Sequence, residues 1–244
     1  MKLRLDKYLA DMGCGTRSEA KKKIRSGMTA VDGIVVKQPE MKIDPAQQSV
    51  TLDGKEIAYR SYEYYMLYKP DGVVTATEDM RERTVLDLFP DRRRRDLFPV
   101  GRLDKDTVGL LLITNDGALA HRLLAPAKHV DKIYQALIDG VVTEEDIRIF
   151  QDGVDIGDDK LCMEAELRIL GIQEEKRVSE IELTIREGRF HQVKRMFHAV
   201  GKEVLFLKRI QMGTLRLDDS LRPGEYRRLT KEEVAKLCSD RRKQ

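Results

Sequence analysis

Residues 101–117 read Gly-Arg-Leu-Asp-Lys-Asp-Thr-Val-Gly-Leu-Leu-Leu-Ile-Thr-Asn-Asp-Gly, and this stretch decides the fold of the larger part of the chain. The apolar run Leu110–Ile113 lies between a glycine and a turn sequence, which is typical of a strand buried on both faces. Asn115 or Asp116 can cap a helix that follows the strand. The stretch therefore predicts a charged loop, then a buried strand, then a helix.

The charged loop carries a candidate for catalysis. Arg102 and Asp104 lie two residues apart, so a cation stands beside a carboxylate. A carboxylate with a fixed cationic neighbour stays ionised and can act as a nucleophile. An ordinary loop salt bridge is the alternative, because such pairs are common and weak.

Length and composition bound the class of protein. The chain has 244 residues, of which 41% are hydrophobic and 36% charged, enough for two small domains or one large one. No run approaches the roughly 18 apolar residues of a membrane span, and the N-terminus lacks the apolar core of a signal peptide. Cys14, Cys162 and Cys238 are scattered and odd in number, which favours a reducing cytoplasm over a disulfide scaffold.

Positive charge is concentrated in two segments. Residues 1–30 hold eight Lys and Arg against three acids, and residues 186–216 hold eight against two, although the net charge of the chain is only +3. Two basic segments on a nearly neutral chain predict two contact zones for a polyanion. Solvated helix faces would give the same count.

The first 60 residues have the pattern of two helices followed by two hairpins. Apolar residues at helical spacing end at Gly13, and Thr16–Glu19 has the form of a capping box that opens a second, basic helix. Asp32–Gly33 and Asp53–Gly54 each separate two apolar runs, which is a hairpin signal.

The remainder of the chain alternates strand and helix patterns. Residues 64–69, 132–138 and 181–185 read as strands, and 191–200 reads as a helix with its apolar face on Val193, Met196, Phe197 and Val200. His191 and His198 are seven residues apart without an acidic third ligand, so no metal site is predicted. The run Arg92–Arg95 is expected to be exposed and mobile.

Residues 101–117 closely resemble the signature of the pseudouridine synthases, in particular the family that modifies ribosomal RNA at single sites. The turn Lys69–Gly72 and the string Glu187–Met196 match the same family. The resemblance implies that Asp104 is the essential catalytic residue, that Lys194 pairs with it, and that Tyr134 stacks on the target base. Arg102 would help to hold Asp104 charged and would fill the space left by the extruded base.

The first 60 residues look like the S4-like RNA-binding domain of a small-subunit ribosomal protein and of some tRNA synthetases. The resemblance implies an α+β fold: this domain at 1–60, a catalytic domain at 61–235 with a mostly antiparallel mixed sheet flanked by helices, and a basic tail at 236–244. The side chains expected to contact RNA are Lys21, Lys22, Lys23, Arg25, Arg189, Gln192 and Arg195.

The implied reaction is the isomerisation of uridine to pseudouridine. The bond between ribose C1′ and uracil N1 breaks, the base turns, and C5 joins C1′, so neither cofactor nor metal is required. Asp104 would either attack the sugar or promote an elimination and readdition, and the sequence leaves both routes open.

Within this family, the string His191–Phe197 looks most like members that act on small-subunit ribosomal RNA. We therefore expect a cytoplasmic monomer that acts on ribosomal RNA within an assembling small subunit, with no membrane and no obligate protein partner. A large-subunit enzyme, a base-releasing glycosylase and a non-catalytic assembly factor are the alternatives. The combination of Asp104, Arg102, Tyr134 and Lys194 favours catalysis over the assembly factor.

Overall fold

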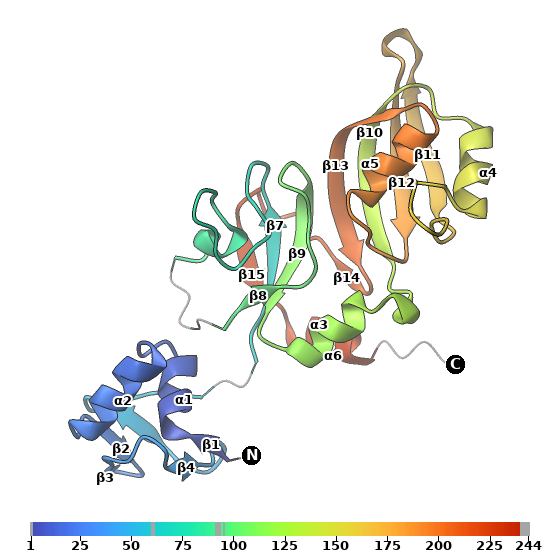
Figure 1. Cartoon of the computed structure of the whole chain (residues 1–244). Helices are drawn as coiled ribbons and strands as arrows, with labels where there is room; N and C mark the ends of the chain where they lie inside the picture. Colours follow the sequence, from blue (N-terminus) through green and yellow to red (C-terminus); the bar gives the residue numbers. More distant parts are fainter. Residues whose placement is uncertain (1, 60–61, 91–93, 95, 240–244) are drawn as a thin grey trace. The chain divides into compact units, whose positions relative to one another are not determined.

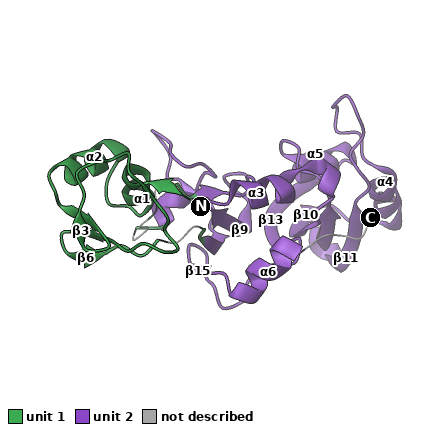
Figure 2. Cartoon of the chain, turned by 90° about the horizontal axis from the view of Figure 1, so that it is seen from below, with its two compact units in different colours: residues 1–63, 89–97 green, residues 64–88, 98–244 purple. Residues whose placement is uncertain are grey.

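The chain forms two compact units. The computed structural model describes residues 2–59, 62–90, 94 and 96–239. The first unit comprises residues 1–63 and 89–97, and the second comprises 64–88 and 98–244. Figure 2 colours the two units separately. The return of 89–97 to the first unit was not predicted from the sequence.

The first unit has the predicted order of two helices and two hairpins (Figure 1). Thr16 and Glu19 form a reciprocal capping box at the start of the second helix. Asp32 and Gly33 both have positive φ, at 50° and 80°, as a two-residue hairpin turn requires. The elements are β1 (Leu3–Arg4), α1 (Leu5–Asp11), α2 (Arg17–Arg25), β2 (Thr29–Val31), β3 (Ile34–Val35), β4 (Lys42–Ile43), β5 (Val50–Leu52) and β6 (Lys55–Glu56).

An ion cluster and an apolar core hold the first unit together. The carboxylate of Asp6 is fully buried and accepts hydrogen bonds from Arg4 at 2.9 and 3.0 Å and from Arg17 at 3.4 Å. Burial acts to raise the pKa of Asp6, but these hydrogen bonds outweigh it and lower the pKa. Leu5, Leu9 and other apolar side chains of both helices pack against the strands.

Arg94 corrects the expectation that the arginine run is exposed. Its side chain is only 2% exposed, donates two hydrogen bonds to Asp96 at 2.6 and 2.7 Å, and lies 6.0 Å from the ring centre of Tyr59. An arginine can be buried in this way because its guanidinium is both paired and stacked. Arg92, Arg93 and Arg95 lie outside the described residues.

The second unit is built on a nine-stranded sheet in the order β11-β12-β10-β13-β9-β7-β15, with β8 paired to β9 and β14 to β13. All neighbours are antiparallel except β9 and β13, so the predicted mostly antiparallel mixed sheet is confirmed. The strands are β7 (Tyr64–Lys69), β8 (Phe98–Pro99), β9 (Val108–Thr114), β10 (Lys132–Asp139), β11 (Glu166–Gln173), β12 (Val178–Ile185), β13 (Glu203–Met212), β14 (Leu215–Arg216) and β15 (Tyr226–Arg228).

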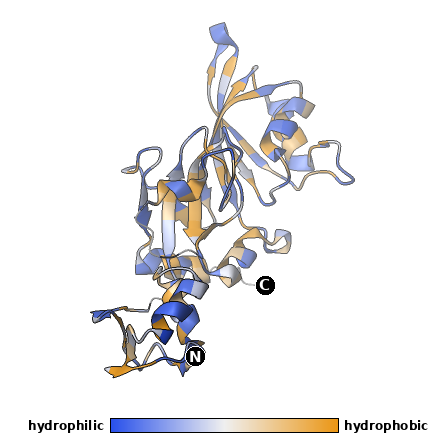
Figure 3. Cartoon of the chain, turned by 60° about the vertical axis from the view of Figure 1, so that its left-hand side comes forward, coloured by the Kyte–Doolittle hydropathy of each residue, from blue (hydrophilic) through white to orange (hydrophobic). Residues whose placement is uncertain are grey.

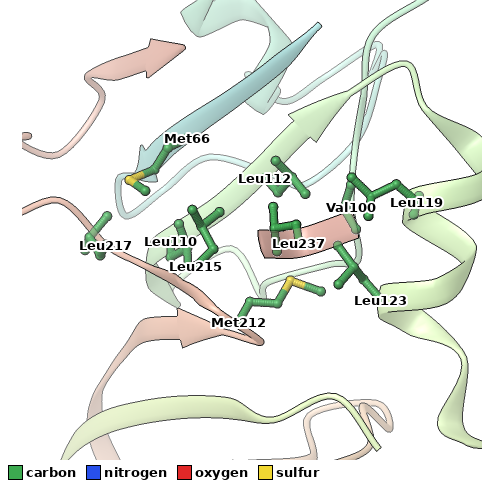
Figure 4. Packing of buried hydrophobic residues seen from close by; sticks show 11 residues of the cluster. Met66, Val100, Leu110, Leu112, Leu119, Leu123, Met212, Leu215, Leu217 and Leu237 are labelled. Carbon is green, nitrogen blue, oxygen red and sulfur yellow. The ribbon is translucent and has the colours of Figure 1, made fainter. Parts of the chain in front are cut away.

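Helices cover the sheet of the second unit. Helix α3 is capped by Asp116, whose carboxylate accepts from the amide of Leu119, and packs with α6 over β7 and β9 (Figure 4). Helices α4 and α5 pack against β11 and β13 (Figure 1). The helices are α3 (Gly117–Leu124), α4 (Glu144–Asp152), α5 (Gln192–Ala199) and α6 (Lys231–Ser239), and short 3-10 turns are η1 (Val85–Leu88), η2 (Pro126–Lys128) and η3 (Glu174–Lys176).

Strand β9 is the centre of this unit, and every one of its residues is buried, as the apolar run predicted. In Figure 3 the central strands of the sheet are coloured largely as hydrophobic. Helix α6 also belongs to this core, because Leu237 is 3% exposed within the cluster of Figure 4. Residues 236–239 are therefore part of the second unit and not of a tail as expected, and residues 240–244 lie outside the described residues.

The parallel contact between β9 and β13 depends on Gly109. It pairs with Arg209 at a φ of +103°, and a Cβ added at Gly109 would lie 2.3 Å from the backbone oxygen of Arg209. Only glycine combines this φ with so close an approach. This contact joins the half of the sheet that contains β7 and β9 to the half that contains β10 to β13.

Replacing Gly109 should therefore destabilise the second unit. We expect Gly109→Ala to lower the free energy of unfolding by about 2–6 kcal/mol, since it adds backbone strain to an overpacked contact. Urea unfolding followed by circular dichroism measures this. Gly171→Ala is the control, because nothing lies within 4 Å of a Cβ at that position in β11. Equal stability of the two variants would contradict the role of the contact.

Candidate active site

A buried lysine anchors the loop that carries Asp104. Lys69 ends β7 and is fully buried, and its ammonium donates to the carbonyl oxygens of Pro70, Lys105 and Thr107 at 2.9–3.0 Å. Burial lowers the pKa of Lys69 to about 8, while Asp71, Asp106 and Asp104 oppose this effect. The two contacts to Lys105 and Thr107 fix the backbone on the C-terminal side of Asp104, and the contact to Pro70 holds the turn after β7 beside it.

The other side of the loop is held by Thr75. Its hydroxyl donates to the carbonyl oxygen of Leu103 at 2.7 Å and accepts from the Leu103 amide at 3.2 Å. The amide of Thr107 donates to the carbonyl oxygen of Asp104 at 3.1 Å and closes the loop as a turn. Asp104 is thus presented on a rigid backbone, with its side chain 28% exposed.

Two side chains from the start of α5 face the Asp104 carboxylate, the imidazole of His191 and the ammonium of Lys194. The Nε2 atom of His191 lies 3.5 Å from Oδ1, and Nζ of Lys194 lies 3.7 Å from Oδ2. Lys194 is much closer to Asp106, at 2.6 and 2.7 Å from its two carboxylate oxygens. That hydrogen bond lowers the pKa of Asp106. Lys194 therefore bridges two carboxylates, and Asp106 is the stronger partner in this structure.

Arg102 does not pair with Asp104. Its side chain is exposed at the edge of the site, and none of the hydrogen bonds and ion pairs among the described residues joins it to Asp104. The expected pairing of Arg102 with Asp104 is therefore absent from this arrangement. An exposed arginine on a rigid loop remains available to a ligand.

A cavity of about 610 Å³ opens beside Asp104. Tyr134, on β10, is 7% exposed and lines this cavity together with Lys132 from the same strand and Arg209 from β13. Phe190 lies on the rim with 71% of its surface exposed, and its ring stacks on that of His191 at a centroid distance of 3.8 Å. The cavity is large enough to accept an extruded nucleotide.

Three residues expected to contact RNA have internal partners. Gln192 is buried and donates to Glu187 at 2.9 Å. Arg189 donates to the carbonyl oxygens of Lys160 and Leu161 at 2.6 Å, and Arg195 donates to Asp158 and to the carbonyl oxygen of Ile156 at 2.6 Å. These side chains tie the loop at 156–161 to the start of α5. Gln192 was expected to contact RNA, but its side chain is buried and its amide is satisfied inside the protein.

The basic residues of α2 are distributed around the helix. Lys22 and Arg25 are exposed, whereas Lys21 and Lys23 are half-buried, and Lys23 donates to the carbonyl oxygen of Cys14 at 2.8 Å. Lys22 and Arg25 therefore offer the most accessible charges of this group.

Sequence reasoning missed three members of the site. His191 was considered only as a metal ligand, Asp106 was regarded as part of the loop, and Lys69 was seen only as part of a turn. A lysine that ends an otherwise apolar strand was the available signal for Lys69, since such a charge needs partners when it is buried.

Comparison with known proteins identifies the class. A family model described as RNA pseudouridylate synthase matches residues 63–199, and one described as S4 domain matches residues 3–56. An RNA pseudouridine synthase of Bacillus subtilis, described as uncharacterized, is 47% identical over 95% of this chain and 97% of its own length. Ribosomal small subunit pseudouridine synthase A of Vibrio cholerae is 40% identical over 96% and 99%. A crystal structure of a pseudouridylate synthase covers 96% of the chain and 99% of its own, with 36% identity and a TM-score of 0.67.

The fold, the carboxylate beside a nucleotide-sized cavity and these matches define an RNA-modifying isomerase. The chain belongs to the RNA pseudouridylate synthase family, with an S4 domain in front of the catalytic domain. This confirms the family and the α+β fold inferred from the signature at 101–117. No helix among the described residues is long and apolar enough to cross a membrane.

Loss of the Lys69 anchor should impair catalysis. We expect Lys69→Met to reduce kcat by about 10²-fold, because a small displacement of the loop misaligns Asp104. Tritium release from RNA labelled at uridine C5 measures the rate. The control is Lys105→Met in the same loop, whose exposed ammonium contacts only the exposed carboxylate of Glu82 among the described residues, and its kcat should remain close to that of the wild type. A wild-type kcat in Lys69→Met would show that the anchor is dispensable.

Proposed function

We propose that this isomerase converts a specific uridine of small-subunit (16S) ribosomal RNA to pseudouridine. The main support is that relatives named ribosomal small subunit pseudouridine synthase A are about 40% identical over nearly the whole chain, S4 domain included. A match of this extent covers the RNA-binding unit and the catalytic unit together. Large-subunit RNA is the alternative substrate within the same family.

Asp104 is proposed as the catalytic carboxylate. It lies on a fixed backbone next to the cavity, and the ammonium of Lys194 and the imidazole of His191 stand within 4 Å of its oxygens. The proposed role is that of an ionised carboxylate positioned by these two side chains. Asp104 would then act either by attack on C1′ or by promoting elimination from the ribose.

The target uridine is proposed to enter the cavity as an extruded nucleotide. Tyr134 would stack on the uracil, because its ring lines the cavity from β10. Arg102 is exposed at the edge of the site and would occupy the space that the base leaves in the RNA. Such an enzyme lowers the cost of extrusion by supplying partners on both sides.

The S4 domain is proposed to anchor the RNA. Lys22 and Arg25 on α2 are exposed and would contact phosphates, with Lys21 and Lys23 beside them. Arg189 and Arg195 would support the site indirectly by holding α5 in place. We further propose that the enzyme acts as a monomer in the cytoplasm on RNA of an assembling small subunit.

The substrate is tested by mapping pseudouridines in ribosomal RNA from cells with and without this protein. We expect one site in small-subunit RNA to lose its modification while all large-subunit sites persist. Purified small-subunit RNA from the deficient cells should regain the modification when the enzyme is added. Loss of a large-subunit site instead would contradict the proposal.

The role of Asp104 is tested by Asp104→Asn. The amide keeps the shape of the side chain but cannot act as an ionised nucleophile, so we expect activity below about one thousandth of the wild-type rate with RNA affinity nearly unchanged. Tritium release and filter binding measure the two effects. Asp106→Asn is the matched comparison in the same loop and should retain measurable turnover. Near-normal turnover by Asp104→Asn would remove Asp104 from this role.

A further inference from the structure

Two buried cations line the active-site cavity and have no assigned role. Lys132 is 7% exposed and Arg209 is 2% exposed. Lys132 lies two residues before Tyr134 on the buried face of β10, and Arg209 is the register partner of Tyr134 on β13. Both side chains therefore border the place where Tyr134 meets the cavity.

The hydrogen-bonding capacity of these cations is largely unused. The ammonium of Lys132 donates to the carbonyl oxygen of Val130 at 3.0 Å, and the guanidinium of Arg209 donates through Nε to that of Leu110 at 2.8 Å. These are the only hydrogen bonds of the two head groups among the described residues, and Nη2 of Arg209 is buried without a partner. Buried donors are nearly always satisfied, so buried N–H groups without a partner beside a cavity indicate that an acceptor binds there.

The pair is also electrostatically costly in the free enzyme. Two like charges close together in a buried site destabilise one another, and desolvation adds to the cost. This unfavourable free energy is offset only when negative charge enters the site. A phosphate of the RNA backbone is a poor candidate, because both side chains are nearly inaccessible from outside. The edge of an extruded base reaches further into a cavity.

We propose that Lys132 and Arg209 bind the carbonyl oxygens of the target uracil and stabilise the negative charge that develops on it as the base leaves. When the bond between N1 and C1′ breaks, its electron pair passes to the uracil and spreads from N1 onto O2 and O4. The base then turns, C5 forms the new bond to C1′ and loses its proton, and N1 takes up a proton, so the product is an isomer of the substrate. No other atom is gained or lost, and two fixed cations beside the carbonyl oxygens would stabilise the uracil anion of the first step.

This inference rests on the isomerase activity of the family and not on which RNA is the substrate. The test therefore uses a transcript that the wild-type enzyme demonstrably modifies, so that an error about the substrate does not affect the outcome. The variants are Lys132→Met, Lys132→Gln and Lys132→Arg. Lys176→Met is the control, since this lysine is exposed in the turn between β11 and β12.

The deciding measurement compares transcripts that contain uridine or 5-fluorouridine. Fluorine makes uracil a better leaving group, so an enzyme without its stabilising cation should be partly rescued. We expect single-turnover glycosidic cleavage by Lys132→Met and Lys132→Gln to fall at least 100-fold on uridine and less than tenfold on 5-fluorouridine. Lys132→Arg should retain at least a tenth of the wild-type rate, and RNA affinity should change less than threefold in all variants.

Equal loss on the two transcripts would overturn the proposal, because a structural role does not depend on the leaving group. A loss of affinity with unchanged single-turnover rate would overturn it in favour of a phosphate contact. Thermal unfolding identifies any variant that fails to fold. If Lys132→Met does not fold, Lys132→Gln and Lys132→Arg test the proposal in its place. Wild-type rates in both neutral variants would also overturn it.

The pH dependence of the single-turnover rate provides a second test. Burial, followed by the charge of Arg209, lowers the pKa of Lys132 to about 8, against the opposing charges of Asp131 and Glu187. The cation is therefore lost as the pH rises through about 8, and the single-turnover rate should decline there. Lys69 also has a pKa of about 8, so its loss of charge can contribute to the decline. Arginine stays protonated, so the decline should be smaller in Lys132→Arg than in the wild type. A decline of the same size in both would show that charge at this position does not limit the reaction.

Discussion

The close parallel contact between β9 and β13 is the constraint on which the site depends. Strand β9 delivers the loop of Asp104, whereas β10, β13 and α5 deliver the cavity and its cations. The two halves of the sheet meet where Gly109 lies against the backbone of Arg209. Because backbone atoms and not flexible side chains make this junction, the Asp104 carboxylate and the cavity wall formed by β10 and β13 are held in a fixed relation.

Charge in the site is arranged in three layers with different exposure. Arg102 lies at the exposed rim of the cavity. Lys194 and Asp104 lie half-buried at its mouth beside the exposed Asp106, and the two carboxylates compete for the Lys194 ammonium. Lys132 and Arg209 are buried, so their interaction with a charged ligand would be the strongest of the three. Under the proposed function, the exposed charges would serve RNA binding and the buried charges the chemistry on one base.

Local sequence patterns predicted most of the fold. The buried strand at 108–114, the capping box at Thr16 and the Asp-Gly turns were recognised because each depends on neighbouring residues only. The return of 89–97 to the first unit was not predicted, because it depends on Arg94 meeting Tyr59 across 35 positions of sequence. Contacts of that kind leave no periodic signal. The run Arg92–Arg95 was therefore predicted to be exposed, although Arg94 is buried.

In the candidate site, too, local features were predicted from the sequence and long-range contacts were not. The loop around Asp104 and the helix with Lys194 were both found from the sequence, but the distances among them depend on the sheet junction. Charge alone was a poor guide near α5, since Arg189 and Arg195 donate to carbonyl oxygens and to Asp158. Basic residues with satisfied donors fix the backbone, whereas those with unsatisfied donors are available to a ligand. Only hydrogen-bond geometry distinguishes the two kinds, and by that criterion Lys132 and Arg209 belong to the second.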